Sequence, residues 1–269
     1  MSVLKNVTIG QYYPGDSAVH RLDPRTKLIL SFAFILVLFL VKGFLAYLTF
    51  AVLVVLVTNL ARVPLKMILR GLRPLTFIIA LTVILHLLTT RGGVTLLTFW
   101  IIRIDSQGVV QAIFLAARLM LLVTATSLLT LTTSPIALTD GLERLLRPGQ
   151  RVGIPAHELA MMMTIALRFI PTLIEEADKI MRAQMARGAD FDTGGFLQRA
   201  KSLLPLLVPL FVSAFRRADE LAMAMEARAY RGGQNRTRMK VLRFSSLDAW
   251  AVLLSIGAFL AAWRIGLYA

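Results

Sequence analysis

The 269-residue chain contains no cysteine and only three histidines. The absence of cysteine excludes a disulfide, a thiolate metal site and a cysteine nucleophile. The histidines, His20, His86 and His157, lie far apart on different predicted segments, which is not the spacing of a shared metal site. We therefore expect no metal centre and no cofactor.

Acidic residues are also scarce, with 15 Asp and Glu against 30 Lys and Arg, so the formal net charge is +15. The chain has no G-x-x-x-x-G-K-[ST] phosphate-binding loop, and we do not expect it to bind or hydrolyse ATP. It has no basic motif interleaved with aromatic residues, so the charge does not indicate nucleic-acid binding. The charge is better explained by membrane topology and by attraction to anionic membrane lipid.

Apolar sequence is what the chain has in abundance: 57% of its residues are hydrophobic and its mean hydropathy is +0.71. Globular chains are typically about 45–50% apolar, so we expect a membrane protein. Five apolar runs predict transmembrane helices, at residues 28–41, 44–60, 74–90, 109–133 and 247–267. Between them we expect a basic loop at residues 61–73 and, at residues 91–108, an external loop with an interfacial segment.

Lys and Arg are distributed unevenly along the chain. They are frequent before the first span and between the second and third spans, and residues 134–247 hold 17 of the 30. By the positive-inside rule, these segments and the N-terminus lie in the cytoplasm. We expect an all-α, multi-pass protein of the cell (plasma) membrane, with an arm and four spans at residues 1–133, a cytoplasmic module at 134–247 and a last span at 248–269.

Two long amphipathic helices are predicted within the cytoplasmic module. The first covers about residues 156–187 and ends at Gly188, and the second covers about residues 196–230 and ends before Gly232. Basic residues followed by glycine are typical of helix C-termini, because cations interact favourably with the negative end of the helix dipole and glycine adopts the left-handed cap. Prolines within these helices predict kinks: Pro171, Pro205 and Pro209.

The ends of the two helices resemble each other. One reads MARGA at residues 185–189 and the other EARAY at residues 226–230. An arginine at a helix tip among small residues can enter a partner's groove and form a bidentate pair with a carboxylate. Arg187 and Arg228 could equally be snorkelling side chains or partners of the helix dipole, and the spacing alone leaves both interpretations open.

Several long stretches resemble the transmembrane T component (EcfT family) of energy-coupling factor (ECF) transporters. They are GQYYPGDSAVHRLDPRTK at residues 10–27, ALRFIPTLIEEADKIMRAQMARGADF at 166–191 and AMEARAYRGG at 224–233. Together with the pattern of spans, the resemblance covers nearly the whole chain. It implies a non-catalytic membrane scaffold that binds two cytoplasmic ABC-type ATPases and one substrate-binding S component. The scaffold couples ATP hydrolysis to uptake of a vitamin or other micronutrient.

The resemblance also implies that the two amphipathic helices are crossed coupling helices, each with an Ala-Arg-Gly motif that docks onto an ATPase. The first motif, Ala186-Arg187-Gly188, matches fully. The second, Ala227-Arg228-Ala229, has alanine in place of glycine. Because alanine disfavours positive φ, we expect a left-handed backbone at residue 229 to be less favoured.

Three residues are candidates for contact with the S component: Met223, Met225 and Arg118. The methionines lie among small residues and offer adaptable contacts. Arg118 lies inside a predicted span, where a charge is costly, so it should face protein, water or an interface; a structural role and substrate contact are its alternatives. The alternative function for the whole chain is a self-sufficient secondary transporter or channel. That class typically has carboxylates inside its spans, whereas here Asp248 lies only at the edge of the last one.

Overall fold

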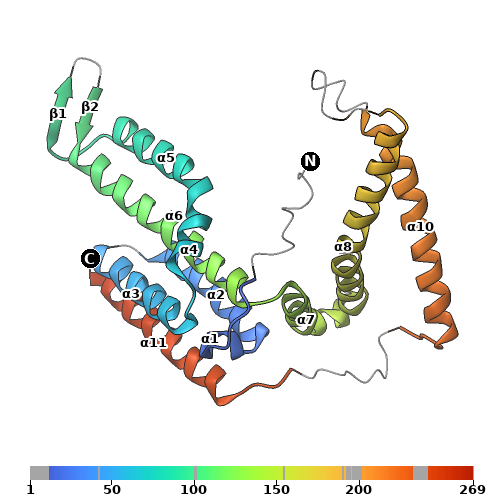
Figure 1. Ribbon diagram of the computed structural model, residues 1–269. Helices are drawn as coiled ribbons and strands as arrows, with labels where there is room; N and C mark the ends of the chain where they lie inside the picture. The colour runs from blue at the N-terminus through green and yellow to red at the C-terminus, as the bar shows by residue number, and fades with distance from the viewer. Residues whose placement is uncertain are drawn as a thin grey trace. The chain divides into compact units, whose positions relative to one another are not determined.

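The computed structural model describes residues 12–41, 43–99, 102–153, 155–189, 191, 195, 202–232 and 242–268, and this part of the chain is predominantly helical (Figure 1). The expected all-α, polytopic fold is confirmed. The helices are α1 (Ala18–Arg21), α2 (Pro24–Leu40), α3 (Phe44–Ala61), α4 (Leu65–Leu72), α5 (Thr76–Thr89), α6 (Ser106–Thr132), α7 (Pro135–Leu146), α8 (Ala156–Ala186), α10 (Leu204–Ala227) and α11 (Ser246–Tyr268), with 3-10 turns at η1 (Arg73–Leu75) and η2 (Arg147–Val152).

The described residues form two compact units. Those within residues 10–142 and 241–269 form the spanning unit, and those within residues 143–240 form the tip unit, which contains α8 and α10. The functional boundaries predicted at residues 134 and 248 stay a prediction.

Helices α2, α3, α6 and α11 supply the core of the spanning unit. The side chains of Leu38, Phe50 and Ala262 are fully buried. Phe50 stacks edge-on against Phe34, with ring centroids 5.3 Å apart, and lies 6.1 Å from the ring of Phe259. Aromatic pairs at these separations add to the burial of apolar area, so they fix how α2, α3 and α11 pack.

Five helices are long and apolar enough to cross a membrane: Phe44–Ala61, Leu65–Thr89, Ser106–Thr132, Ala156–Ala186 and Ser246–Gly266. Four of them correspond to predicted spans. The fifth is α8, which the sequence had placed in the cytoplasmic module. Helix α2, predicted as the first span, has 17 residues, and at 1.5 Å per residue it is about 26 Å long, slightly less than the apolar thickness of a bilayer.

The expectation of a basic loop at residues 61–73 was wrong. After the left-handed Arg62, the chain forms α4, which continues through η1 into α5. Ile68 is buried while Leu65 and Leu69 are exposed, so α4 is an amphipathic helix with basic residues interleaved. The basic residues concealed an apolar spacing of three and four residues, which is the helical signal.

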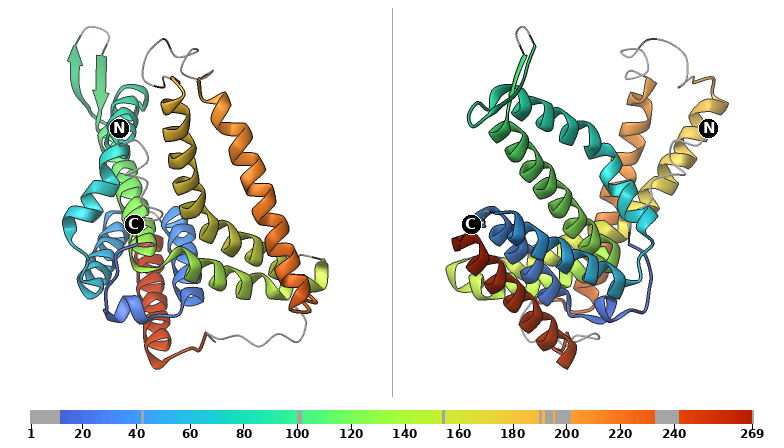
Figure 2. Two further views of the ribbon diagram at one scale, coloured as in Figure 1. Left: turned by 45° about the vertical axis from the view of Figure 1, so that its right-hand side comes forward. Right: turned by 90° about the vertical axis from the view of Figure 1, so that its left-hand side faces the viewer.

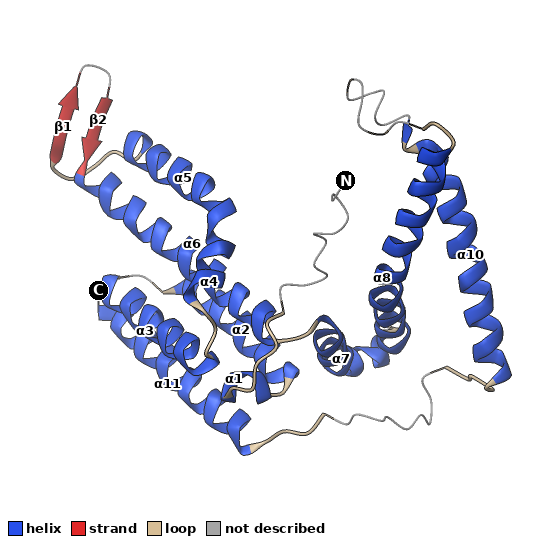
Figure 3. Cartoon of the chain, viewed as in Figure 1, coloured by secondary structure: helices blue, strands red, loops and turns tan. Residues whose placement is uncertain are grey.

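The segment at residues 91–108, expected to be an external loop with an interfacial segment, contains two short strands, and its place outside the membrane stays a prediction. Strands β1 (Thr95–Phe99) and β2 (Ile102–Asp105) pair antiparallel as a hairpin next to the ends of α5 and α6, and they are the strands drawn in Figure 3. Asp105 anchors the hairpin, because its Oδ2 accepts the backbone N–H of Gly92 at 2.9 Å. The alternation of isoleucine with charged residues in β2, which reads IRID, is the strand signal.

A buried charged cluster (Asp23, Arg25, Lys27 and Asp248) joins the start of α2 to the start of α11. Asp23 caps α2 as expected, accepting the Arg25 N–H at 2.9 Å, and its other oxygen lies 2.7 Å from the Arg25 guanidinium. Asp248 Oδ1 accepts the Asp23 N–H at 2.8 Å. Lys27 Nζ donates to the carbonyl oxygen of Thr132 at 2.9 Å. Each buried charge therefore has a specific partner, as burial requires.

In the tip unit, α8 and α10 lie side by side and run in opposite directions (Figures 1 and 2). Pro171 lies inside α8, which both figures show as a bent helix, and Pro209 lies inside α10. Pro205 was expected to interrupt the second helix, but it lies in its first turn, where its missing N–H costs no hydrogen bond.

Candidate functional site: two arginine-tipped helices

The first tip is the C-terminus of α8, where the predicted end of the helix is confirmed. Arg187 is the C-cap residue, with φ −90° and ψ 9°, and Gly188 follows with φ +87°. The Gly188 N–H bonds the carbonyl of Met185 and the Ala189 N–H bonds the carbonyl of Gln184, both at 3.0 Å. This pair of bonds is the Schellman motif, which uses a left-handed residue to satisfy the last carbonyls of a helix.

The second tip is the C-terminus of α10, and its geometry is nearly the same. Arg228 is the C-cap residue, with φ −93° and ψ 15°. The Ala229 N–H bonds the carbonyl of Glu226 at 2.8 Å, and the Tyr230 N–H bonds the carbonyl of Met225 at 3.0 Å. The two tips therefore present an arginine from the same cap position on the same backbone.

The expectation that residue 229 would avoid the left-handed region was wrong, because Ala229 has φ +53°. A left-handed alanine costs about 1–2 kcal/mol, since its Cβ approaches the following carbonyl oxygen. The two hydrogen bonds of the cap offset this cost. The Tyr230 hydroxyl adds a weak contact to Met161 Sδ of α8 at 3.1 Å, which holds the tip against the neighbouring helix. Tyr230 was not identified from the sequence as a functional residue. Its position directly after the Ala-Arg-Ala motif could have indicated that it supports this tip.

Both arginines are exposed, and among the described residues neither guanidinium has a hydrogen bond or ion pair. The small residues beside them, Ala186, Gly188 and Ala227, are exposed as well. A Cβ built on Gly188 meets no atom within 4 Å, so the space around this tip is open. Such a tip can approach a partner closely with a charged, five-donor group at its point.

The two arginines lie at opposite ends of the helix pair. Tyr230 contacts Met161 in the second turn of α8, whereas Arg187 lies at the other end of that helix. The 26 residues between Met161 and Arg187 span about 39 Å along α8. One small ligand cannot reach both tips, so they suit two separate contacts.

The candidates for contact with the S component lie in different surroundings. Met223 is 61% exposed on α10, and Met225 is half-buried. Arg118 is half-buried in the spanning unit, where its Nε donates to the Tyr47 hydroxyl at 2.8 Å and its guanidinium lies 5.2 Å from the ring of Phe39. These contacts favour the structural alternative for Arg118.

A family of cobalt transport proteins, CbiQ, matches residues 15–239 of the chain. An energy-coupling factor transporter transmembrane protein EcfT from Thermosediminibacter oceani is 57% identical over 96% of the chain and 98% of that protein. The EcfT proteins of Clostridium kluyveri and Bacillus subtilis are 52% and 48% identical, each over 94% of the chain and over 94% and 96% of those proteins.

The helices, the absence of an ATP-binding loop in the sequence and these similarities define a non-catalytic, multi-pass component of a membrane transporter. The chain belongs to the EcfT family, the transmembrane component of energy-coupling factor transporters. The alternative of a self-sufficient secondary transporter or channel is not supported.

Proposed function

We propose that the chain couples ATP hydrolysis by two cytoplasmic ABC-type ATPase subunits to uptake of a vitamin or other micronutrient through one membrane-embedded S component. The observation that carries this proposal is the pair of matched caps at Arg187 and Arg228. Each presents an exposed arginine, and about 39 Å of α8 separates them. Two docking points at this separation fit two subunits better than one.

Each ATPase would receive one tip in a groove that contains a carboxylate. An Arg–carboxylate pair is bidentate, so it fixes orientation as well as distance. The rigid Schellman cap matters here, because a frayed helix end would let the arginine rotate without transmitting the movement of its partner. The docking residues are Ala186, Arg187, Gly188, Ala227, Arg228 and Ala229.

The chain would lie in the plasma membrane with its N-terminus and the tip unit in the cytoplasm, so α8, although long and apolar enough to cross a membrane, would not cross it. The support is the placement of basic residues, with 17 of the 30 Lys and Arg in residues 134–247. This orientation puts both tips in the compartment that contains ATP.

The S component would contact the apolar surface of the tip unit. Exposed apolar side chains of α10 include Val208, Phe211 and Phe215 as well as Met223. Flexible methionines suit a surface that must repack as its partner moves. We include Met223 and Met225 in this contact; Arg118 is the weaker candidate, because Tyr47 and Phe39 already engage it.

The test is charge reversal at the tips, with Arg187→Glu and Arg228→Glu in the chain co-expressed with its ATPases and S component. Losing a desolvated carboxylate pair costs about 2–5 kcal/mol, so each variant should lose one of the two bound ATPases, and ATP-dependent uptake in proteoliposomes should fall at least tenfold. Arg182→Glu is the matched control, because Arg182 is exposed on α8 five residues before the tip. Unchanged assembly and uptake in both tip variants would exclude arginine docking.

A further inference from the structure

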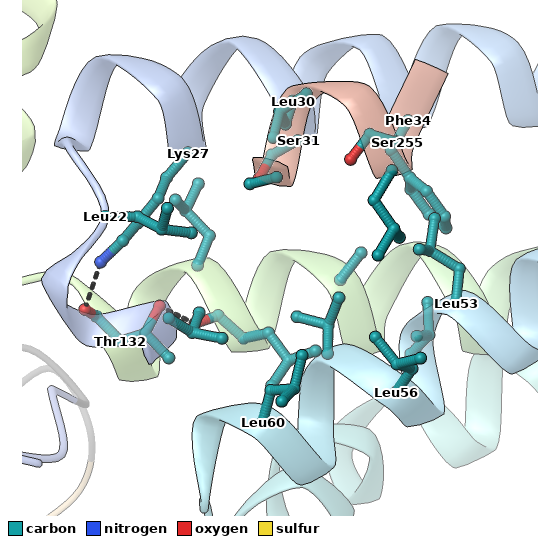
Figure 4. Close-up of a pocket in the computed structure, with 18 of the residues that line it drawn as sticks. Leu22, Lys27, Leu30, Ser31, Phe34, Leu53, Leu56, Leu60, Thr132 and Ser255 are labelled. Atoms are coloured by element: carbon teal, nitrogen blue, oxygen red, sulfur yellow. Dashed lines mark hydrogen bonds between the residues drawn. The ribbon is translucent and has the colours of Figure 1, made fainter. Parts of the chain in front are cut away.

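An apolar groove of about 310 Å³ lies in the spanning unit between α2, α3, α6 and α11 (Figure 4). Phe34 and Phe259 line its inner end, near the place where the rings of Phe50 and Phe259 meet. Lys27 and Thr132 line the other end. The groove therefore extends from the aromatic core of the unit to the ends of the helices.

The groove opens between the second half of α3 and the first half of α11. Lining residues on both sides of this opening are substantially exposed: Leu56 39%, Leu60 50%, Trp250 70% and Leu254 49%. These helices are candidate membrane spans. The opening thus faces the hydrocarbon of the bilayer, and in a membrane such a space is filled by whatever apolar chain fits it.

An exposed arginine, Arg62, lies near the place where the groove meets the ends of the helices. Lys27 Nζ donates to the carbonyl oxygens of His20 and Thr132 and to the Thr133 hydroxyl, and the carboxylates of Asp23 and Asp248 in the same cluster balance its charge. Arg62 follows the lining residue Leu60 by two positions; it is exposed, and its guanidinium has no hydrogen bond or ion pair with any residue that the structure describes. The cluster of Asp23, Arg25, Lys27 and Asp248 is neutral overall, so Arg62 supplies the positive charge at this end of the groove.

We propose that this groove binds one acyl chain of an anionic phospholipid, with the phosphate near Arg62 and the indole of Trp250 at the level of the headgroups. Tryptophan prefers that level because its ring is apolar and its N–H is polar. Basic residues at the membrane surface attract anionic lipid.

An acyl chain is a single file of methylenes and is thin enough to enter a groove of about 310 Å³ between these helices. The bound lipid would complete the packing between α3 and α11.

The experiment uses the full-length chain in nanodiscs without an S component. The discs contain a trace of phosphatidylglycerol with a photoreactive group on one acyl chain, or phosphatidylcholine with the same chain. After illumination, mass spectrometry locates the modified residues. We expect labelling on residues 53–60 and 247–255 that is at least threefold stronger with phosphatidylglycerol.

Two adjacent leucines provide a matched pair of variants. Leu254 lines the groove, whereas Leu253 does not and is 61% exposed. Leu254→Trp should fill the groove and reduce labelling at least threefold, and Leu253→Trp should leave it unchanged. Equal labelling in the two variants, or labelling that is spread evenly over all helices, would overturn the proposal.

A surface charge tests the headgroup without altering the core. Arg62→Gln should reduce the preference for phosphatidylglycerol over phosphatidylcholine at least twofold. Arg91→Gln is the control, because Arg91 is exposed near the start of α6 and Thr132 lies at that helix's other end, about 40 Å away. If Arg62→Gln leaves the preference intact, the anionic headgroup is excluded. If adding an S component displaces all of the label, the groove is a protein interface and the proposal fails.

Discussion

Charged residues serve opposite purposes in two regions of this protein. In the buried charged cluster, Asp23 and Asp248 are 5% and 3% exposed, and each makes hydrogen bonds to neighbouring groups. At the two tips, Arg187 and Arg228 are exposed, and their guanidinium groups have no partner within the described residues. A buried charge must be satisfied inside the fold, whereas an exposed charge on a rigid cap is available to another molecule. Changes to the buried charged cluster should therefore affect the stability of the protein, and changes to the two tip arginines should affect its assembly with partners.

The largest expected effect is on assembly. Because the tips are about 39 Å apart along α8, their contributions should be independent, and distant sites are usually additive. Arg187→Glu and Arg228→Glu should each leave one ATPase bound per chain, and the double variant should leave none, as counted by native mass spectrometry. Thermal stability of the chain alone should not change. Loss of both ATPases in either single variant would show that the tips act together.

The next effect concerns the buried cluster and should appear in stability. Asp248→Ala removes the acceptor of the buried Asp23 N–H, and an unsatisfied buried donor costs about 1–3 kcal/mol. The unfolding temperature in detergent should fall. Asp219→Ala, an exposed carboxylate on α10, is the control and should have little effect. If the unfolding temperature falls equally in both variants, buried and exposed carboxylates contribute equally to stability, and the contrast between the two regions is wrong.

A smaller effect separates the two tips from each other. Gly188→Ala puts a left-handed alanine into the first tip, and Ala229→Gly removes one from the second. Each change should alter the stability of its cap by about 1 kcal/mol, in opposite directions. Hydrogen exchange at residues 188–189 should become faster in the first variant, and exchange at residues 229–230 slower in the second. Faster exchange in Ala229→Gly would contradict the strain assigned to Ala229.

The smallest effect is expected between α8 and α10. Arg217 and Glu176 approach to 4.0 Å, and both side chains are about 30% exposed. Pairs of this kind contribute about 0.2–1 kcal/mol. A double-mutant cycle with Arg217→Ala and Glu176→Ala, read by unfolding temperature, should give a coupling energy in that range that shrinks in high salt. A larger coupling energy that resists salt would mean that this pair is desolvated by other contacts.

Much of the architecture could be predicted from the sequence because its signals are local. Apolar runs marked four of the five candidate spans, and the predicted start and end of α8 were confirmed. Asp23 was expected to cap α2, and it does. Two elements were missed, α4 and the β1–β2 hairpin, because short segments with mixed charge give weak periodicity.

The sequence predicted which residues form the candidate site but not the backbone geometry of that site. The repeated Ala-Arg pattern pointed to Arg187 and Arg228. Intrinsic preference argued against a left-handed Ala229, yet the cap imposes φ +53° there. The preference of alanine for negative φ is overridden at this turn. Two hydrogen bonds of the cap and the contact of Tyr230 with Met161 stabilise the left-handed backbone there.

The sequence by itself determined that the protein is helical, crosses a membrane, lacks an ATP-binding loop and carries an arginine at the end of each of two long helices. These properties depend on composition and on residues close together in the chain. The tertiary structure decided that the two arginine caps match, that they lie at opposite ends of a helix pair, and that Asp23 meets Asp248 across 225 residues. It also decided that four helices leave an apolar groove between them. Such features arise from packing between distant segments, which no local pattern encodes.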